Sequence, residues 1–322
     1  MLSNSLESEI IATTRAMATE VTIKIAPTKG SHELRESDDA LRGALEVFHA
    51  VETACTRFDP TSPLMRANAA PARWHKVPAV LYEALREANI AHQRTEGRFD
   101  PRVLEDLVAL GYDRSLAFAS GNVVTAPRPV RRASARQRGP WRPRFRGGSH
   151  EVLLGEAVDL GGIGKGLAVR WSSQVLAPRH ANYMIEAGGD CYCAGVARDG
   201  DNWRVGVEDP FGGDEPLAVL SLRDRAATTS SVRLRHWRAG GEVVHHLIDP
   251  RTGRPGGKSL VAVTVVGKDP AAAEIDSKTL FLADHQIARA ARQQGIAALW
   301  VHANGAVDSS ANMNRYVMWQ RS

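Results

Sequence analysis

The residues best suited to chemistry lie in one glycine-rich stretch, from Val158 to Gly166. It reads Val-Asp-Leu-Gly-Gly-Ile-Gly-Lys-Gly, so four glycines surround Lys165, and a segment with helical periodicity follows. Glycines allow a tight turn and a close approach of the backbone to a ligand. The N–H groups at a helix start attract anions. The stretch predicts a diphosphate site, although it matches neither common nucleotide-binding glycine pattern, so a closely packed strand-to-helix turn is the alternative.

A second candidate site is the stretch from His245 to Gly253, which reads His-His-Leu-Ile-Asp-Pro-Arg-Thr-Gly. A predicted strand delivers two histidines and leads into an Asp-Pro turn that a glycine closes. His246 and Asp249 then lie on one turn, as a general base and its neighbour. An imidazole with a pKa near neutrality suits removal of a proton from a hydroxyl. The alternative for Asp249 is turn formation alone, because Asp and Pro both start turns.

Two shorter segments carry charged residues in an arrangement that could be functional. The segment 186–190 reads Glu-Ala-Gly-Gly-Asp after a predicted strand. Its two glycines permit close approach to a ligand, or they form a hairpin turn or a β-bulge. Glu274 and Lys278 lie four residues apart in a predicted helix, in the favourable order for a surface ion pair. Such a pair contributes only a few tenths of a kcal/mol, so stability gives little reason for it.

Hydrophobic periodicity predicts the elements that must position these groups. Strands are expected at 18–25, 151–160, 181–186, 203–208, 217–222, 243–248, 260–267 and 297–302. Helices are expected at 38–57, 78–95, 101–111, 164–177, 270–283 and 285–294. Groups of strands with helices between them indicate an α+β fold, in which sheets pack together and helices lie outside.

Composition indicates a cytoplasmic globular protein. A chain of 322 residues fits one large domain or two fused ones, and we interpret residues 1–322 as a single domain. A run of 18 apolar residues is missing, so no membrane-spanning helix is expected. The N-terminus lacks the basic and apolar regions of a secretory signal. Three cysteines, Cys55, Cys191 and Cys193, fit reduced thiols better than disulfides.

The positive net charge comes from one local segment. Residues 114–150 hold nine arginines and no Lys, Asp or Glu, so the formal charge of +5 becomes −4 without them. Their mixture of Arg, Pro and Gly predicts a basic, disordered loop insert at 126–150. A nucleic-acid contact is one interpretation of such a segment. A solvated linker is favoured instead, because Trp141 and Phe145 are its only large aromatic residues.

Eight anchors, taken in order along the chain, resemble the FAD:protein FMN transferase family (ApbE-like proteins). The resemblance covers residues 15–302 apart from the arginine-rich insert. The anchors are Met17–Thr19, Thr56–Pro60 with Ser62–Asn68, Gly97–Pro101, Asp159–Gly166, Gly188–Asp190, Trp203–Pro210, Thr229–Ser231 and His246–Gly253.

The resemblance implies an ApbE-like (T-fold-like) duplicated α/β architecture with mixed, mainly antiparallel sheets and flanking helices. It implies that FAD lies between the two halves and that a magnesium ion and Lys165 hold its diphosphate. A Thr or Ser hydroxyl of an acceptor flavoprotein then attacks the FMN phosphorus, and AMP leaves. The alternative within the family is a catalytically weak or inactive protein that binds FAD or FMN.

The resemblance also implies roles for individual residues. His246, Asp249 and Lys165 are the implied catalytic residues, with His246 and Asp249 serving proton removal or substrate orientation. The implied cofactor-binding set is Met17, Asp59, Asn68, Phe99, Asp100, Gly161, Gly162, Lys165, Gly188, Gly189, Asp190, Thr229, Ser230 and His246.

The helix that carries the metal site departs from the family pattern. The family reads A-D-A-x-x-T-A, whose Asp and Thr bind magnesium, and the matching residues here are Glu274 and Lys278. The implied metal ligands are therefore Gly164, through its carbonyl, and Glu274. Because a protonated Lys278 repels a cation, we hypothesise that it takes the place of the metal and pairs with diphosphate oxygens. The competing hypothesis keeps the metal with Asp276 or Thr279, although their spacing puts them on other helix faces.

Overall fold

An eight-stranded antiparallel sheet forms the centre of the computed structural model, which describes residues 9–26, 37–118, 123–127 and 139–321. Every neighbouring pair of strands in this sheet runs antiparallel. In spatial order the strands are β1 (Ile10–Ala16), β2 (Thr19–Ile25), β7 (Tyr183–Ala187), β8 (Asp190–Ala194), β11 (Arg225–Ser231), β16 (Leu260–Gly267), β17 (Ala297–His302) and β18 (Val307–Ser309).

Both faces of this sheet are covered, which explains its apolar central strands. In β16, Val263 and Val265 pack against helices, whereas Ala262 and Val266 pack against a second, three-stranded sheet. That second sheet has the order β19-β10-β9. Its strands are β9 (Trp203–Val207), β10 (Ala218–Leu222) and β19 (Val317–Gln320). A strand buried on both faces reads as a continuous apolar run, as residues 260–267 do.

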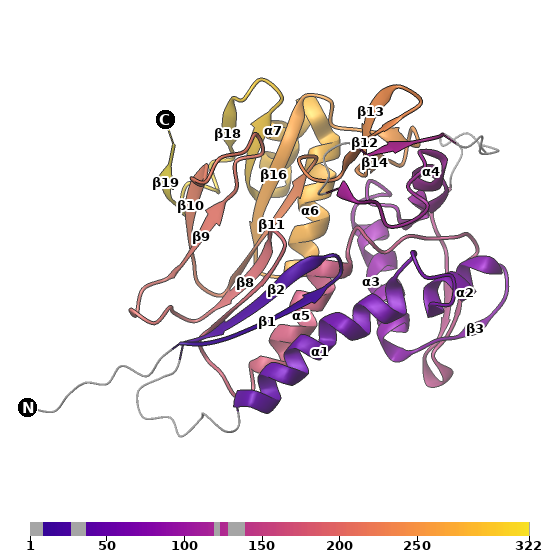
Figure 1. Ribbon diagram of the computed structural model, residues 1–322, viewed down its shortest axis with the longest axis horizontal. Helices are drawn as coiled ribbons and strands as arrows, with labels where there is room; N and C mark the ends of the chain where they lie inside the picture. The colour runs from indigo at the N-terminus through magenta and orange to yellow at the C-terminus, as the bar shows by residue number, and fades with distance from the viewer. Residues whose placement is uncertain (1–8, 27–36, 119–122, 128–138, 322) are drawn as a thin grey trace, which may run out of the picture.

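Three helices cover the other face of the central sheet (Figure 1). They are α1 (Ser37–Cys55), α5 (Gly164–Leu176) and α6 (Pro270–Ala283), and α7 (Ile287–Gln294) packs beside α6. Helix α6 begins sharply because Asp269 caps it by accepting a hydrogen bond from the Ala272 N–H, with Pro270 in the first turn. Helix α5 has no such cap, since Ile163 precedes it. In its first turn, the N–H groups of Gly164 and Leu167 instead donate to backbone carbonyls, and that of Gly166 donates to the Glu274 carboxylate.

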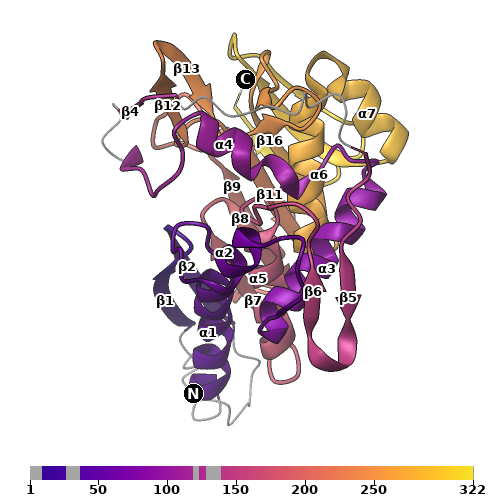
Figure 2. The same ribbon diagram turned by 90° about the vertical axis from the view of Figure 1, so that its right-hand side faces the viewer.

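The remaining elements extend the helical side of the molecule (Figure 2). The helices there are α2 (Pro63–Ala69), α3 (Ala79–Arg94), the 3-10 turn η1 (Pro101–Val103) and α4 (Leu104–Ala109); η4 (Gly147–Ser149) and η5 (Asp284–Gln286) are further 3-10 turns. Three small sheets are formed by β3 (His75–Lys76), β5 (Arg144–Arg146) and β6 (Glu151–Leu153), by β4 (Val124–Thr125), β12 (His236–Ala239) and β13 (Glu242–His245), and by β14 (Ile248–Asp249) and β15 (Arg254–Pro255).

Most of the elements expected from periodicity are confirmed, including the α+β class with mainly antiparallel sheets. The six expected helices and the strands at 18–25, 181–186, 203–208, 217–222, 260–267 and 297–302 lie within a few residues of their predicted positions. The expected strand at 243–248 is two strands, β13 and β14, separated at His246 and Leu247. Strands β1, β8, β11, β12, β18 and β19 were not predicted. Strand β11 reads Arg-Ala-Ala-Thr-Thr-Ser-Ser, so its small and polar residues hide its central place in the sheet.

The expected strand at 151–160 is wrong beyond its first residues, because β6 ends at Leu153. The residues after Leu153 do not continue the strand, and the backbone of Val158 pairs with a side chain instead. The Asn68 amide donates to the Val158 carbonyl at 2.8 Å and accepts from its N–H at 2.9 Å. The Asp159 N–H donates to the Pro101 carbonyl at 2.7 Å. A side-chain amide thus supplies the donor and acceptor that a neighbouring strand otherwise supplies.

The prediction of a disordered basic insert at 126–150 is wrong for residues 139–150, and residues 128–138 lie outside the described part of the chain. Trp141 is 2% exposed, and its indole N–H donates to the Leu154 carbonyl at 3.0 Å. Arg144 and Arg146 lie over the ring of Trp74 and belong to β5. Burial of one aromatic side chain and stacking of guanidinium groups order this stretch despite its composition.

The described residues contain no helix whose length and apolar character would let it cross a bilayer.

We expect Trp141→Ala to lower the free energy of unfolding by about 3–5 kcal/mol, because it removes a large buried side chain. Trp319→Ala is the matched control, since Trp319 is 44% exposed, and its effect should stay within about 0.5 kcal/mol. Urea denaturation followed by circular dichroism measures both. Equal effects of the two substitutions would contradict the anchoring role of Trp141.

Candidate active site

Four charged side chains meet where α5, α6 and the β7–β8 hairpin come together. Lys165 forms an ion pair with Asp190, and the Lys278 Nζ lies 2.9 Å from the Glu274 Oε1. The carboxylates are almost fully buried, with side-chain exposures of 1% for Asp190 and 2% for Glu274, whereas the two lysines keep 15–16%. Buried charges persist only when they are paired and hydrogen-bonded. The cluster therefore contains two partly exposed lysine side chains that are paired with two buried carboxylates.

The β7–β8 hairpin sets the position of Asp190. Gly188 and Gly189 have φ angles of +57° and +86° and connect two directly paired residues, Ala187 and Asp190. This is the backbone shape of a two-residue hairpin that favours glycine. A Cβ on Gly188 would lie 2.3 Å from the Thr19 Oγ1, so a side chain is excluded there. The hairpin-turn interpretation of 186–190 is confirmed, and the turn also presents the Gly188 carbonyl to the Lys165 Nζ at 3.4 Å.

The glycine-rich turn is crowded by side chains from three other segments. The Asp159 carboxylate accepts a hydrogen bond from the Gly161 N–H at 2.8 Å, which stabilises the turn. A Cβ on Gly162 would lie 3.1 Å from the Phe99 ring and 3.5 Å from the Lys278 Cε. A Cβ on Gly164 would lie 3.2 Å from the Met17 Cε. Phe99, Met17 and Lys278 thus converge on the turn, and the cofactor-binding role of Phe99 and Met17 stays a prediction.

Met17 reaches the turn from the tip of the β1–β2 hairpin. Met17 and Ala18 have φ angles of +54° and +59°, which direct the chain through a tight turn. The Met17 N–H donates to the Glu52 Oε1 at 2.9 Å, which ties this tip to helix α1. The role of Glu52 was not predicted, because a Glu in a helix gives no sign that it binds a backbone N–H 35 residues away.

Gly166 lets α5 and α6 approach closely enough to complete the charged cluster. Its N–H donates to the Glu274 Oε2 at 2.7 Å. A Cβ at this position would lie 2.7 Å from the Ala271 Cα and 2.8 Å from the Pro270 carbonyl oxygen. Glycine is required here for close packing between helices, which was the alternative interpretation of the motif. Close packing and a candidate anion site are therefore both features of the same nine residues.

The two buried carboxylates respond differently to their surroundings. Burial opposes ionisation of Glu274, yet the Lys278 and Lys165 ammonium groups and the Gly166 N–H hold its pKa below its usual range. Burial raises the pKa of Asp190, and the nearby Glu274 carboxylate adds to that shift while Lys165 opposes it. Asp190 therefore depends on Lys165 for its negative charge.

The histidine-containing loop lies against the same helix, α6. The rings of His245 and Phe281 meet edge-to-face with centroids 5.9 Å apart. The His246 Nδ1 lies 3.3 Å from the Arg235 carbonyl oxygen. Burial, with the positive charges of Arg235 and Lys278, holds the pKa of His246 well below 6.5. The loop and the charged cluster both contact helix α6, the loop through Phe281 and the cluster through Glu274 and Lys278.

Asp249 serves the turn that follows the histidines. Its carboxylate accepts from the Arg251 N–H at 2.9 Å and pairs with the Arg251 guanidinium at 2.8 Å. Its carbonyl oxygen accepts from the Gly253 N–H at 2.8 Å. These bonds fit the turn-forming alternative for Asp249, and its predicted catalytic role stays a prediction.

The other predicted flavin-pocket residues lie in three different places. Thr229 and Ser230 join the cluster from β11, since the Thr229 N–H donates to the Asp190 Oδ1 at 3.2 Å and the two hydroxyls of Ser230 and Ser277 are 2.8 Å apart. Asn68 and Asp100 lie behind the glycine turn: Asn68 holds Val158, and Asp100 pairs with Arg102 at 2.7 Å. Asp59 is exposed and accepts from the Thr61 N–H at 2.8 Å.

The donors at the predicted metal position do not fit a magnesium ion. Each oxygen of Glu274 already accepts a hydrogen bond, one from Lys278 and one from Gly166, and each oxygen of Asp190 does so from Lys165 and Thr229. Magnesium needs near-octahedral oxygen ligands without competing cations. Within the described ranges, no group of three or more His, Cys, Asp or Glu side chains is arranged to hold a metal.

The alternative ligands of the competing hypothesis are occupied elsewhere. The Asp276 carboxylate pairs with Arg94 of helix α3 at 2.8 Å. The Thr279 hydroxyl donates to the Asp276 carbonyl at 3.1 Å, and Thr279 is buried. Both residues lie on faces of α6 other than the one that carries Glu274 and Lys278.

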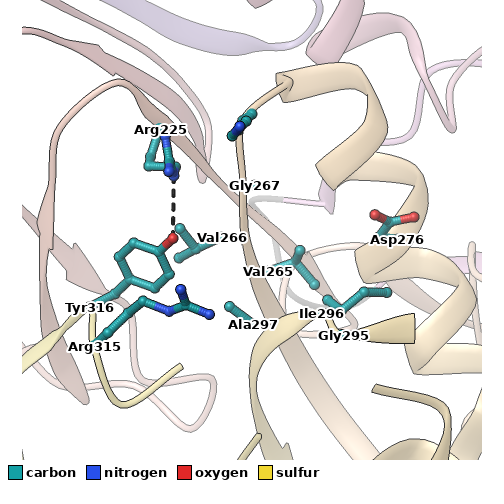
Figure 3. A pocket seen from close by; sticks show the side chains of 11 residues that line it. Arg225, Val265, Val266, Gly267, Asp276, Gly295, Ile296, Ala297, Arg315 and Tyr316 are labelled. Carbon is teal, nitrogen blue, oxygen red and sulfur yellow. Dashed lines mark hydrogen bonds between the residues drawn. The ribbon is translucent and has the colours of Figure 1, made fainter. Parts of the chain in front are cut away.

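Two cavities lie outside the charged cluster. One of about 320 Å³ is bordered by Arg225, Arg315 and Tyr316 on one side and Asp276 on the other, with the Arg225 Nε 3.2 Å from the Tyr316 hydroxyl (Figure 3). The other, of about 400 Å³, lies behind the glycine turn, and its lining includes Asn68, Arg102 and Glu156. Neither cavity is lined by Lys165, Asp190, Glu274 or Lys278.

The fold and site together define an α+β protein in which a lysine-bearing glycine turn faces a buried cluster of paired charges. The chain belongs to the ApbE family, whose model matches residues 17–300. The family resemblance of the eight anchors is therefore confirmed.

Individual relatives agree with this assignment. A protein of Treponema pallidum named FAD:protein FMN transferase is 27% identical over 302 residues, which cover 84% of this chain and 82% of the relative. A crystal structure of the ApbE protein from Thermotoga maritima superposes with a TM-score of 0.79 at 22% identity, covering 98% of this chain and 100% of that one. The flavin transferase ApbE from Vibrio cholerae gives a TM-score of 0.76 at 21% identity, covering 96% and 99%. At these identities the solved structures support the fold.

We expect Gly166→Ala to lower the free energy of unfolding by about 1–3 kcal/mol, because its Cβ meets backbone atoms of α6. At a helical position with free space, replacing glycine by alanine would instead raise the free energy of unfolding by roughly 1 kcal/mol. A decrease for Gly166→Ala therefore measures the cost of moving the two helices apart. Gly148→Ala is the control, since a Cβ there meets nothing within 4 Å. Chemical denaturation measures both variants, and a gain in stability for Gly166→Ala contradicts the close approach.

Proposed function

We propose that this protein transfers FMN from FAD to a Thr or Ser hydroxyl of an acceptor flavoprotein and releases AMP. Membership of the ApbE family supports the proposal, as do relatives named FAD:protein FMN transferase. The observation that carries it in this chain is the convergence of the Lys165 turn and the His246 loop on helix α6. Helix α6 thus contacts both candidate sites, through Glu274 at the turn and through Phe281 at the histidine loop.

The proposed reaction is a phosphoryl transfer. The acceptor oxygen forms a bond to the FMN phosphorus, and the bond from that phosphorus to the bridging oxygen breaks. AMP leaves with the electron pair of the broken bond, and the hydroxyl proton passes to a base. Such a reaction needs the reactants positioned and the developing negative charge on the oxygens neutralised.

Lys165 is suited to neutralise that charge. Its ammonium is held by the buried Asp190 and by the Gly188 carbonyl, and 15% of its side chain stays exposed. Lys165 belongs to the first turn of α5, where the positive end of the helix dipole favours an anion. Asp190 acts in this proposal by orienting Lys165.

His246 is suited to take the hydroxyl proton. Because burial and the neighbouring positive charges lower its pKa, the imidazole is neutral at physiological pH and has a basic nitrogen available. Its Nδ1 lies next to the Arg235 carbonyl, which favours a proton on that nitrogen and leaves Nε2 as the acceptor. Asp249 then orients the loop through its turn.

The remaining proposed roles concern the flavin and the surroundings of the reaction. Met17 and Phe99 supply apolar surface beside the glycine turn for the flavin, and Asn68 and Asp100 hold the backbone behind it. We place the protein in the cytoplasm, because its cysteines are free thiols in the structure. Nucleic acid is not a proposed partner, since Arg146 of the arginine-rich stretch stacks on the protein's own Trp74.

We expect Lys165→Met to reduce the rate of AMP release from FAD about 10²–10³-fold, as loss of one charge-stabilising donor does. The assay incubates purified protein with FAD and an acceptor flavoprotein and measures AMP by chromatography and covalent flavin by fluorescence in a gel. Lys268→Met is the control, because Lys268 is exposed. A wild-type protein that binds FAD and releases no AMP with any acceptor would favour the flavin-binding alternative.

The rate of transfer should show no acid-side loss with a midpoint near 6.5, the ordinary pKa of histidine. His246 is neutral above its depressed pKa, so it stays a base from about pH 6 to about pH 8. The unfolded chain takes up a proton on this imidazole below about 6.5 whereas the folded protein does not, so stability falls as the pH drops through that range. Rate–pH and urea–pH profiles measure the two effects. A transfer rate that halves near pH 6.5 contradicts the neutral-base assignment.

A further inference from the structure

We infer that Lys278 is a built-in cation that takes the place of a divalent metal, so that this protein binds the diphosphate of its substrate without a metal ion. The inference rests on the proposed function for the identity of the ligand. It specifies that Lys278 neutralises part of the negative charge of that diphosphate.

The charge balance of the cluster supports the inference. Two ammonium groups, Lys165 and Lys278, face two buried carboxylates, Asp190 and Glu274, so the cluster is neutral before any ion is added. All four carboxylate oxygens already accept hydrogen bonds. A divalent cation would have to displace an ammonium from its carboxylate and then lie beside the other one. Repulsion between like charges at such a distance opposes this arrangement.

The position of the Lys278 side chain points to the same role. Its stem runs past the glycine-rich turn, with the Cε 3.5 Å from the place where a Cβ of Gly162 would lie. A Cβ at Gly162 would make an ordinary van der Waals contact with this stem, so the stem packs directly against the turn. The ammonium lies near the first turn of α5, because both it and the Gly166 N–H bind Glu274, and a helix start favours an anion. Only 16% of the side chain is exposed, so the group is held in place instead of moving in solvent.

Glu274 acts as a tether in this arrangement. Its Oε1 fixes the Lys278 ammonium at 2.9 Å, and its Oε2 accepts from the Gly166 N–H at 2.7 Å. A surface ion pair at this spacing contributes little, but this carboxylate is only 2% exposed and is joined to a second helix. The pair is therefore a positioned group of the site and not a surface feature of α6.

The chemistry of an ammonium sets the consequence for the reaction. Lys278 has one positive charge and three hydrogen-bond donors, one of which is used by Glu274. It neutralises a phosphate oxygen as a point charge, but it does not bind two oxygens by coordination. Binding and transfer are thus expected to be insensitive to chelators.

Binding of FAD and of ADP to the purified wild-type protein tests the inference directly. Isothermal titration calorimetry and flavin fluorescence quenching give the dissociation constant in buffer with EDTA and in buffer with magnesium. We expect the two constants to agree within about twofold. AMP release is measured in the same two buffers, and the two rates should also agree.

Substitution of Lys278 should convert the site to metal dependence. Lys278→Thr removes the ammonium and leaves a hydroxyl beside the Glu274 and Asp190 carboxylates, a set of oxygen donors that suits magnesium. We expect this variant to bind ADP at least about tenfold more weakly in EDTA than in magnesium. Lys268→Thr is the matched control and should behave like the wild type, because Lys268 is exposed outside the cluster. Circular dichroism and thermal melting confirm that each variant is folded.

The outcomes separate this inference from the proposed function. Loss of wild-type ADP binding and AMP release in EDTA, restored by magnesium, overturns the built-in cation and leaves the transferase function intact. Metal-independent binding with no AMP release under any condition supports the built-in cation and overturns the transferase function. A wild-type protein that binds neither FAD nor ADP in either buffer overturns both. A Lys278→Thr variant whose binding ignores magnesium also overturns the inference.

Discussion

The crossing of α5 and α6 at Gly166 is the constraint on which the site depends. A hydrogen atom in place of a side chain lets the two helices approach until the Gly166 N–H reaches Glu274. That contact joins one oxygen of Glu274 to the first turn of α5, while its other oxygen binds Lys278. The close packing of the two helices thereby brings the Lys165 and Lys278 side chains to the same site. The chemistry proposed for the glycine-rich stretch follows from its packing, and the two explanations of the motif are parts of one arrangement.

Helix α6 contacts both candidate sites. Its middle carries Glu274 and Lys278 beside the glycine turn, and its last turn carries Phe281 against His245. Asp269 fixes the first turn of this helix and also binds Arg170 of α5 at 2.6 Å, while Arg170 binds Glu87 of α3 at 2.6 Å. A buried helix with fixed ends is a precise support for groups that must meet one ligand.

Sequence patterns were sufficient for the α+β class, the main helices and the family, but not for the contacts around the candidate site. Gly188-Gly189 indicates a tight hairpin, because its positive φ angles favour glycine. The position of β11 was hidden, because its Thr and Ser residues are buried by neighbours distant in the chain. The order around Trp141 was likewise hidden, since composition does not reveal a single aromatic anchor. Nor does local sequence reveal that Asn68 replaces a strand partner for Val158.

The neutral cluster has a consequence for how the protein would release what it makes. In the proposed function, the two linked phosphates of FAD would face two ammonium groups held on separate helices. Cleavage would leave one phosphate on AMP and the other on the flavin of the acceptor. Each product would then engage one lysine, and Asp190 and Glu274 could each pair again with its own lysine. Re-formation of the two ion pairs would favour product release, because the ligand that separated them has been divided.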